Sequence, residues 1–543
     1  MLCSVHCASC TRSPLVLHFR SYRIQQFRNI TLSTRQSAQR PTDELFRYTS
    51  GRWICHIWLA ERYLQFSLPA LQKVIATATG RSASDMVSFS KLSEAGFNRL
   101  FQATFSDGKN VIARLLYPST GPNHYAVARE VAALDYLRLH GFTTPKVYGW
   151  CSTRGNPVGA EYIIMEKLDG APLGDMCIYY RNDVLSGEGI PLLNHGGREF
   201  CIGPVAHYSW WHEERAALEI DRGPWLSSDD IFRAAGEREL KWATAYAKPR
   251  LPYERLYREI YNFRRISPDS HIQNLDNYLN LARCLGFQSG RPLERPVMRH
   301  PDLQPNNILV SESHEIAGLM DWKHSSILPL GHAAGIPSHF QDYPDPDWEK
   351  LLEPQINLPA NYDSLDPSEQ CSVRQTMRKR LVHFLYAAFT KRLNGEHYHA
   401  IFNQSVILHQ RLFKTADTPW EGDSITLRAE MIRAIQSWQT LITKDSINNG
   451  SGTCTTPPFQ YTDTVTQETL QLDAQPKEAD VVMEEMRDVL GVDILGWVPN
   501  EEYEAAKEKD REVKARMLEV AKTPRDITAA QDHFPFDDFD ERL

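Results

Sequence analysis

The chain has 543 residues, and its 60 Lys and Arg against 68 Asp and Glu give a net charge of −8 at pH 7. A chain of this length has room for roughly two to four domains, whereas its mildly acidic balance argues against a nucleic-acid-binding protein, and its apolar runs are too short to span a bilayer. Its ten Cys complete no paired C-x-x-C zinc motif, so we expect reduced thiols or ordinary core residues.

Residues 1–42 form a basic leader that contains six Arg, no Asp or Glu, and many Ser and Thr. This composition is typical of a mitochondrial transit peptide, so we expect the protein in mitochondria. A secretory signal is disfavoured, because the apolar stretch around Leu15 is short and is interrupted by His18 and Arg20. A basic leader without a targeting role is the alternative.

A folded domain begins near residue 43, with a helical-looking segment over residues 59–79. The hydrophobic period then changes to that of strands, with a tight loop and a turn between them, as at the start of a kinase-type small lobe. The loop holds Gly96, Phe97 and Asn98, and its backbone N–H groups could cover phosphates. With one Gly this signal is weak, and an ordinary hairpin is the alternative. The three predicted strands cover residues 87–92, 100–105 and 111–116.

Arg114 lies inside the third predicted strand, among apolar neighbours, where a cation needs a partner. In the helix that follows, Val127, Glu130, Val131 and Leu134 share one face by their spacing, which places the Glu130 carboxylate on an apolar stripe. We therefore predict that Arg114 pairs with Glu130 and also reaches nucleotide phosphate. The alternative is an edge-strand Arg and a rim Glu that both reach water.

Two further strands are predicted over residues 147–151 and 162–165. The second leads into a polar run, so Met165 and Glu166 form a candidate hinge whose main-chain groups could meet an adenine edge. A plain strand-to-loop junction is the alternative.

Residues 171–295 are the least informative part of the sequence. Trp210, Trp211, Asp221 and Arg222 could line a substrate cleft, although core aromatic residues with a structural ion pair are the more ordinary interpretation. Ser227 is a candidate N-cap for a helix that runs to about residue 247.

The segment Arg299–Trp322, RHPDLQPNNILVSESHEIAGLMDW, carries the strongest chemical signal. A hairpin centred near residue 314 would set Asn307 opposite Asp321, with Asp302 in a Pro-stiffened loop at the same end. An Asn amide oxygen and an Asp carboxylate suit Mg²⁺. Asp302 is then free to orient a hydroxyl and accept its proton, which is the H-x-D-x-x-x-x-N arrangement, here beginning at His300, followed by a metal-binding Asp.

Two other interpretations of this segment stay open. Each residue could be structural, with Asp302 and Asn307 in turns and Asp321 at a strand end. Alternatively, His300, Asp302, Asp321 and His324 could be the ligands of a metal-dependent hydrolase, although this leaves Asn307 unexplained.

The remainder of the chain is expected to be mainly helical, with helices over residues 372–393, 397–414 and 425–443. Residues 444–476 are assigned to a linker. Helices are expected again near residues 477–490 and 500–522, and the second is dense in alternating charge, so it is a solvated face or a partner-docking helix. The acidic, aromatic end is a disordered tail or a further partner-binding segment.

These motifs resemble the aminoglycoside phosphotransferase family, a branch of the protein-kinase-like fold. A closer resemblance, to a group of fungal mitochondrial proteins, rests on GRW, SEAGFNRLF, IARLLYP, DRGPW and RHPDLQPNNILV. The resemblance implies an α+β, two-lobe fold, with a small β-rich N-lobe and a larger helical C-lobe, and it implies ATP and Mg²⁺ as cofactors. By position it makes Asp302 the catalytic base, Asn307 and Asp321 the magnesium ligands, and Arg114 with Glu130 the strand–helix pair.

We therefore expect an ATP- and magnesium-dependent phosphotransferase that acts on a hydroxyl of a small molecule. The rival is a nucleotide-binding pseudokinase or scaffold, because Arg114 stands where this family often has Lys and Pro301 where Gly is common before the catalytic Asp. No nucleic-acid partner or membrane span is expected. The expected organisation is a transit peptide over 1–42, an N-lobe over 43–168, a C-lobe over 169–443, a linker over 444–476 and a helical extension with tail over 477–543.

Overall fold

The computed structural model describes most of the chain, and the predicted transit peptide lies outside the described residues. The described ranges are 45–48, 51–53, 62–94, 96–117, 120–172, 203–205, 207–211, 213–225, 227–313, 315–341, 354, 358–442, 454–493 and 496–537.

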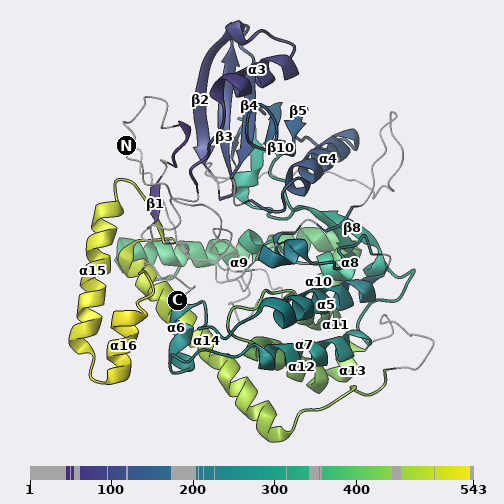
Figure 1. Ribbon diagram of the computed structural model, residues 1–543, viewed down its shortest axis with the longest axis vertical. Helices are drawn as coiled ribbons and strands as arrows, with labels where there is room; N and C mark the ends of the chain where they lie inside the picture. The colour runs from purple at the N-terminus through teal and green to yellow at the C-terminus, as the bar shows by residue number, and fades with distance from the viewer. Residues whose placement is uncertain are drawn as a thin grey trace.

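A five-stranded antiparallel sheet forms the core of the first lobe, with the order β2-β3-β4-β6-β5 (Figure 1). Strands β3 and β4 pair from Asn98 with Leu116 to Thr104 with Asn110. The turn between them needs a left-handed residue, and Gly108 supplies it at φ 81°. All five strands were predicted, and their bounds are β2 Met86–Glu94, β3 Asn98–Phe105, β4 Asn110–Leu116, β5 Val147–Cys151 and β6 Tyr162–Glu166.

Different helices cover the two faces of this sheet. Because strand side chains alternate between faces, Ala113 and Leu115 of β4 share a core with Ile75 of α3 (Leu68–Ala78). Ile112 points to the other face and packs with Val127 of α4 (Tyr125–Leu139). The even positions of β4 therefore face α4.

The second lobe is mainly helical, and its largest apolar cluster joins five helices. Leu275 and Tyr278 of α7 pack with Leu412 of α11 and Met431 of α12. Ser227 occupies the N-cap position of α5, as predicted, but its hydroxyl donates to Asp230 and caps no backbone N–H, and the helix ends at Tyr246. The helix bounds in this lobe are α5 Ser228–Tyr246, α6 Arg255–Ile260, α7 Asp269–Ala282, α8 Leu330–Ala333, α9 Pro367–Leu393, α10 Gly395–Ile401, α11 Gln404–Ala416, α12 Ile425–Gln436 and α13 Trp438–Leu441.

Two helices predicted as continuous are each interrupted. The expected helix over 397–414 divides into α10 and α11, because the Asn403 side chain accepts from two backbone N–H groups and starts a new helix. The expected helix over 425–443 divides at Ser437 into α12 and α13.

Short strands connect the lobes. β9 (Ile308–Val310) pairs antiparallel with β10 (Ile316–Leu319), which is the predicted hairpin, and β7 (Ala171–Pro172) pairs on the other edge of β9. β8 (Pro296–Arg299) pairs with β11 (Ser326–Pro329). The segment between these pairs holds the candidate catalytic residues.

The C-terminal extension packs against the second lobe and also pairs with the N-terminal end of the described chain. β1 (Gly51–Trp53) forms an antiparallel pair with β12 (Trp497–Pro499), and the helices α15 (Tyr503–Val520) and α16 (Pro524–Asp532) lie beside them at the left of Figure 1. Arg255 of α6 donates to the backbone carbonyls of Phe534 and Asp537.

Helix α14 (Asp463–Leu490) begins inside the range predicted as a linker, so that prediction is wrong for residues 463–476. The helix has an N-cap, Thr462, whose side chain accepts from the Val465 N–H. It is also held by packing, since Asp473 is buried and accepts from Arg433 of α12 at 2.5 Å. Pro476 lies within this helix.

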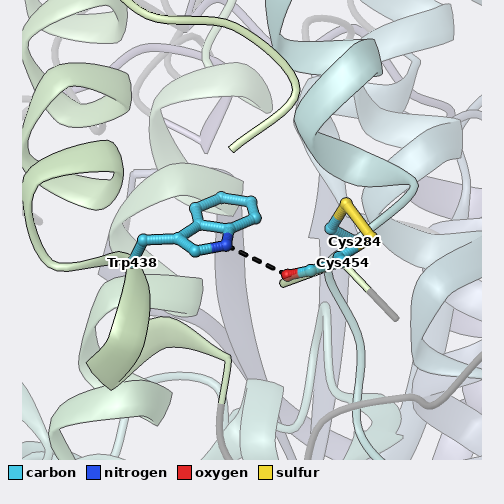
Figure 2. The surroundings of a disulfide bond; sticks show 3 residues. All are labelled: Cys284, Trp438 and Cys454. Carbon is cyan, nitrogen blue, oxygen red and sulfur yellow. Dashed lines mark hydrogen bonds between the residues drawn. A yellow bond between two sulfur atoms is a disulfide. The ribbon is translucent and has the colours of Figure 1, made fainter. Parts of the chain in front are cut away.

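Cys284 and Cys454 form a disulfide bond across 170 residues of sequence, so the expectation of reduced thiols is wrong for this pair. Cys284 follows α7, and the Cys454 carbonyl accepts a hydrogen bond of 3.0 Å from Trp438 Nε1 (Figure 2). The pairing depends on tertiary packing of distant segments, which the spacing of Cys in the sequence does not reveal. Among the described cysteines, Cys151 is a free thiol.

The chain thus has the predicted α+β, protein-kinase-like two-lobe fold, with a β-rich first lobe and a larger helical second lobe (Figure 1). In the part of the chain that the structure describes, every helix is too short or too polar to cross a membrane.

Candidate active site

Arg114 and Glu130 form the predicted ion pair. Arg114 is at an even position of β4 and so faces α4, where Glu130 lies on the same side as Val127 and Val131. Arg114 Nη1 donates to Glu130 Oε1, and the two side chains are 6% and 1% exposed. Pairing offsets the cost of burying both charges in an apolar layer.

Asp321 completes a bridge through Arg114 that joins residues 207 positions apart. Arg114 Nη2 donates to Asp321 Oδ1 at 2.5 Å. Burial opposes ionisation of Asp321, but the charges of Arg114 and Lys323 outweigh it and hold the pKa of Asp321 well below its usual value. The Asp321 carboxylate is therefore ionised, and it remains 38% exposed. Its backbone is left-handed at φ 60°, which the sequence pattern did not predict.

His300 connects the loop of Asp302 to the strand that precedes Asp321. Its Nε2 donates to the Met320 carbonyl at 2.7 Å, and its Nδ1 accepts from the Asp302 N–H at 3.2 Å. Burial lowers the pKa of His300, so the ring is neutral, with its proton on Nε2. The edge of the Trp322 ring meets it at 4.6 Å between centroids. His300 thus holds the Asp302 loop in place, and a catalytic role for His300 stays a prediction.

Asp302 is a partly buried carboxylate with one amide partner. Gln304 Nε2 donates to Asp302 Oδ2 at 2.6 Å. Burial raises the pKa of Asp302 above its ordinary value, and the nearby His339 acts in the opposite direction. A raised pKa makes the carboxylate a stronger base, which suits a group that accepts a hydroxyl proton. His339, in the 3₁₀ helix η9 (Ser338–Phe340), was not identified from the sequence.

Asn307 lies beside Asp302, as predicted, but in the 3₁₀ helix η8 (Pro305–Asn307) and not in the strand. Its Nδ2 donates to the Asp302 carbonyl at 2.8 Å, and its own carbonyl accepts from the Met320 N–H at 2.9 Å. The amide nitrogen is thereby fixed, and Oδ1 is the atom of this side chain that could bind a metal ion. Asn307 Oδ1 and Asp321 Oδ2 are hard oxygen donors that fit Mg²⁺.

The loop between β2 and β3 contacts the candidate site through the side chain of Phe97. The Phe97 carbonyl accepts from the Tyr117 N–H at 3.0 Å and from Thr120 Oγ1 at 2.5 Å, which fixes the loop. Its ring lies under Lys323, with Nζ 3.9 Å from the ring centroid. Lys323 is 5% exposed. Sequence reasoning singled out the loop backbone and missed this contact, because it joins segments far apart in the chain.

Gly96 and Asn98, which were predicted with Phe97 as phosphate-loop residues, make contacts with Arg62 and Leu116. The Gly96 carbonyl accepts from Arg62 at 3.4 Å, and Asn98 is buried and pairs with Leu116. They support the position of Phe97, and their contact with a nucleotide stays a prediction.

The predicted hinge is the end of β6. Met165 is buried against α4, and the Glu166 N–H donates to the Lys146 carbonyl at 2.8 Å. The Glu166 carboxylate accepts from the Lys146 N–H at 3.0 Å and from Arg138 at 3.4 Å. These bonds tie the strand end to β5 and α4, so Glu166 holds the hinge through its side chain, and adenine contact there stays a prediction.

The aromatic residues of the predicted substrate cleft are largely structural. Trp210 is 2% exposed, and Arg222 stacks on the Trp211 ring at 4.1 Å and donates to three backbone carbonyls. Asp221 accepts from Trp225 Nε1 at 2.9 Å. The structural interpretation fits these contacts, except that Asp221 bonds to Trp225 and Arg222 to backbone carbonyls in place of the expected ion pair.

The metal-hydrolase alternative does not fit His300, because both of its ring nitrogens are already hydrogen-bonded. Over the described residues, no group of three or more His, Cys, Asp or Glu side chains is arranged to hold a metal ion. A magnesium site like that of kinases needs fewer protein ligands, because phosphate and water supply most of the ligands.

Comparison with known proteins places the chain among fungal relatives. It is 28% identical to a subtelomeric hrmA-associated cluster protein of Aspergillus fumigatus, over 79% of this chain and 93% of that protein. It is 22% identical to altered inheritance of mitochondria protein 9 of Yarrowia lipolytica, over 74% of this chain and 77% of that protein. No family model matches the chain.

Among solved structures, the ethanolamine kinase of Plasmodium vivax aligns with 68% of this chain and 87% of its own, at 13% identity and a TM-score of 0.31. Several of the sequence relatives carry "mitochondrial" in their names. The chain is thus similar in sequence to the proteins named altered inheritance of mitochondria protein 9.

Proposed function

We propose that the protein is an ATP- and magnesium-dependent phosphotransferase that acts on a hydroxyl of a small molecule. The observation that carries this proposal is the bridge from Glu130 through Arg114 to Asp321, which brings a strand, a helix and the end of β10 to one place. At the same end of the β9–β10 hairpin, the Asn307 side-chain amide donates a hydrogen bond to the Asp302 carbonyl. Phosphoryl transfer needs this kind of positioning and charge neutralisation rather than covalent chemistry from the protein.

In this proposal Asp302 orients the acceptor hydroxyl and takes its proton. The hydroxyl oxygen forms a bond to the terminal phosphorus of ATP while the bond to the leaving ADP breaks. Mg²⁺ held by Asn307 and Asp321 would neutralise charge on the phosphate chain. His300 keeps the Asp302 loop against Met320 and so fixes the distance between base and metal ligands.

A mitochondrial location is part of the proposal. The basic, acid-free leader over residues 1–42 supports it, and so do the relatives that are named as mitochondrial proteins. Their names also suggest a role in mitochondrial maintenance. A form that lacks residues 1–42 and still enters mitochondria would contradict the targeting role of the leader.

The second candidate is a nucleotide-binding pseudokinase or scaffold. The observation that favours it is that Arg114 occupies one oxygen of Asp321, the residue proposed to hold magnesium. The exposed, charged helix α15 would then offer a docking surface for a protein partner.

Transfer of labelled phosphate from ATP to a panel of hydroxylated metabolites separates these candidates. We expect transfer by the wild type and a loss of about 100-fold or more in Asp302→Asn. Asp276→Asn, an exposed carboxylate on α7, is the matched control and should keep full activity. If Asp302→Asn keeps wild-type activity, the assignment of the base is wrong. ATP binding without transfer to any acceptor would favour the scaffold.

A further inference from the structure

The N-terminal half of α4 contacts a segment of the second lobe at two positions one turn apart. The rings of Tyr125 and Trp211 lie 4.9 Å apart between centroids, and Arg129 Nη1 donates to the Pro204 carbonyl at 2.6 Å. Positions i and i+4 share one side of a helix, so both contacts hold the same side of α4. The N-cap residue, His124, makes no capping hydrogen bond with its side chain, so contacts from outside the helix take a larger share in fixing this end.

The residues that meet α4 are bonded to one another and packed on α5. Trp211 Nε1 donates to the Val205 carbonyl at 2.8 Å, and the Val205 N–H donates to the Arg222 carbonyl at 2.7 Å. The Arg222 guanidinium lies 4.1 Å from the centroid of the Trp211 ring, and the cluster packs against Ala234 of α5. The α4 clamp is the name used below for Pro204, Val205, Trp211 and Arg222.

Arg129 is half-buried, and burial lowers its pKa below the ordinary value of Arg. In the part of the chain that the structure describes, its hydrogen-bond partner is the neutral Pro204 carbonyl. Desolvating a guanidinium to reach a neutral group is costly. Such an exception to ordinary burial is expected where a side chain has a positional task.

Glu130, the helix end of the bridge to Asp321, lies between two contacts that hold α4. Arg129 precedes it and meets the clamp, and on its C-terminal side Leu134 packs against Trp322. The donor–acceptor distance of a hydrogen bond varies by only a few tenths of an ångström, so a displacement of α4 on the order of 1 Å would break the bridge.

We propose that the clamp fixes the position of α4, and that Arg129 is a positioning residue that keeps Glu130 within hydrogen-bonding distance of Arg114. The inference rests on the proposed function, in which the bridge positions Asp321 for magnesium. It also gives a role to the aromatic segment before α5. Without the clamp, α4 would be displaced part of the time, and the bridge would be assembled in a fraction of the molecules. The turnover number should fall with that fraction.

Hydrogen exchange followed by mass spectrometry tests the clamp without reference to activity. In Arg129→Met we expect exchange about 10-fold faster in peptides from α4 and in the peptide that contains Asp321, which is the effect of losing one hydrogen bond from a charged donor. Peptides from α12 should exchange as in the wild type. Arg233→Met changes an arginine on α5 that is 58% exposed, and this matched control should change no exchange rate.

Phosphoryl transfer tests whether Arg129 acts through Glu130. Arg129→Met should lower kcat about 10-fold, and Glu130→Gln should lower it at least as much. The double variant should lose no more than Glu130→Gln alone, because the position of α4 matters through the bridge. A structural role of Arg129 that is independent of the bridge would instead give the product of the two losses.

The inference is wrong if α4 of Arg129→Met exchanges as in the wild type, or if the two losses in kcat multiply. If Arg129→Met does not fold, Tyr125→Leu takes its place, since it removes the ring contact with Trp211 and keeps Arg129. Unchanged exchange in α4 of that variant would then overturn the inference. If the wild type transfers phosphate to no acceptor, the proposed function fails, and the exchange rates alone decide whether the clamp exists.

Discussion

Removing one partner of the Arg114–Glu130 pair should cost more stability than removing both. Arg114→Met removes the cation that pairs with the Glu130 carboxylate. This carboxylate is 1% exposed, and its Oε2 accepts no hydrogen bond. We therefore expect a loss of about 3–5 kcal/mol in the free energy of unfolding. Glu130→Leu leaves Arg114 with Asp321 as a second carboxylate, so we expect a smaller loss of about 1–3 kcal/mol.

The double variant Arg114→Met/Glu130→Leu replaces both charges by apolar side chains among Ile112, Val127 and Ile163. Asp321 is 38% exposed and can turn to water, so the expected loss is at most about 1–2 kcal/mol, far below the sum of the single losses. Urea unfolding followed by circular dichroism measures all three.

The control for this cycle is Arg233→Met, which breaks an ion pair whose side chains are 58% and 31% exposed and should change stability by less than about 1 kcal/mol. Strict additivity of the two single losses would refute the reasoning, because it would mean that the buried charges do not interact.

Three other predictions follow from single contacts. Burial raises the pKa of Asp302, and the ionised form of Asp302 is the proposed base. As pH decreases, kcat/KM should therefore fall at a pH above the pKa of an ordinary Asp. A kcat/KM that stays constant down to the pKa of an ordinary Asp would contradict this. Gly331→Ala places a Cβ 2.2 Å from the Phe287 ring and should cost about 1–3 kcal/mol of unfolding free energy, whereas Gly395→Ala, which meets nothing within 4 Å, should cost nothing. Cys454→Ser opens a link across 170 residues and should lower stability by up to about 5 kcal/mol, measured as a lower Tm that reductant reproduces in the wild type.

The parts of the fold that the sequence predicted are those set by local pattern. The strands β2 to β6 are short runs of strand-forming residues bounded by turn or loop residues, and α4 follows the spacing of Val127, Glu130 and Val131. The same logic paired Arg114 with Glu130, since a charge on an apolar face needs a partner from the adjoining element.

The parts that it did not predict depend on contacts between distant segments. The pairing of β1 with β12 and the disulfide between Cys284 and Cys454 have no local signal. The first turns of α14 were predicted to be part of a linker. They are helical because α14 packs against α12, including the hydrogen bond from Arg433 to Asp473. Lys323 was passed over for the same reason, since its ring partner comes from the first lobe.

Arg114 of β4 can make contacts that a lysine at this position could not make, and these contacts affect the choice between an enzyme and a scaffold. A lysine has one charged atom and would have to choose between Glu130 and Asp321, whereas the two terminal nitrogens of Arg114 hold both. This joins the two lobes through one side chain, which is the kind of positioning that the proposed phosphoryl transfer needs. A guanidinium has five N–H donors, so these two bonds do not by themselves withhold Arg114 from phosphate. The arginine in place of lysine is therefore no argument against phosphate binding.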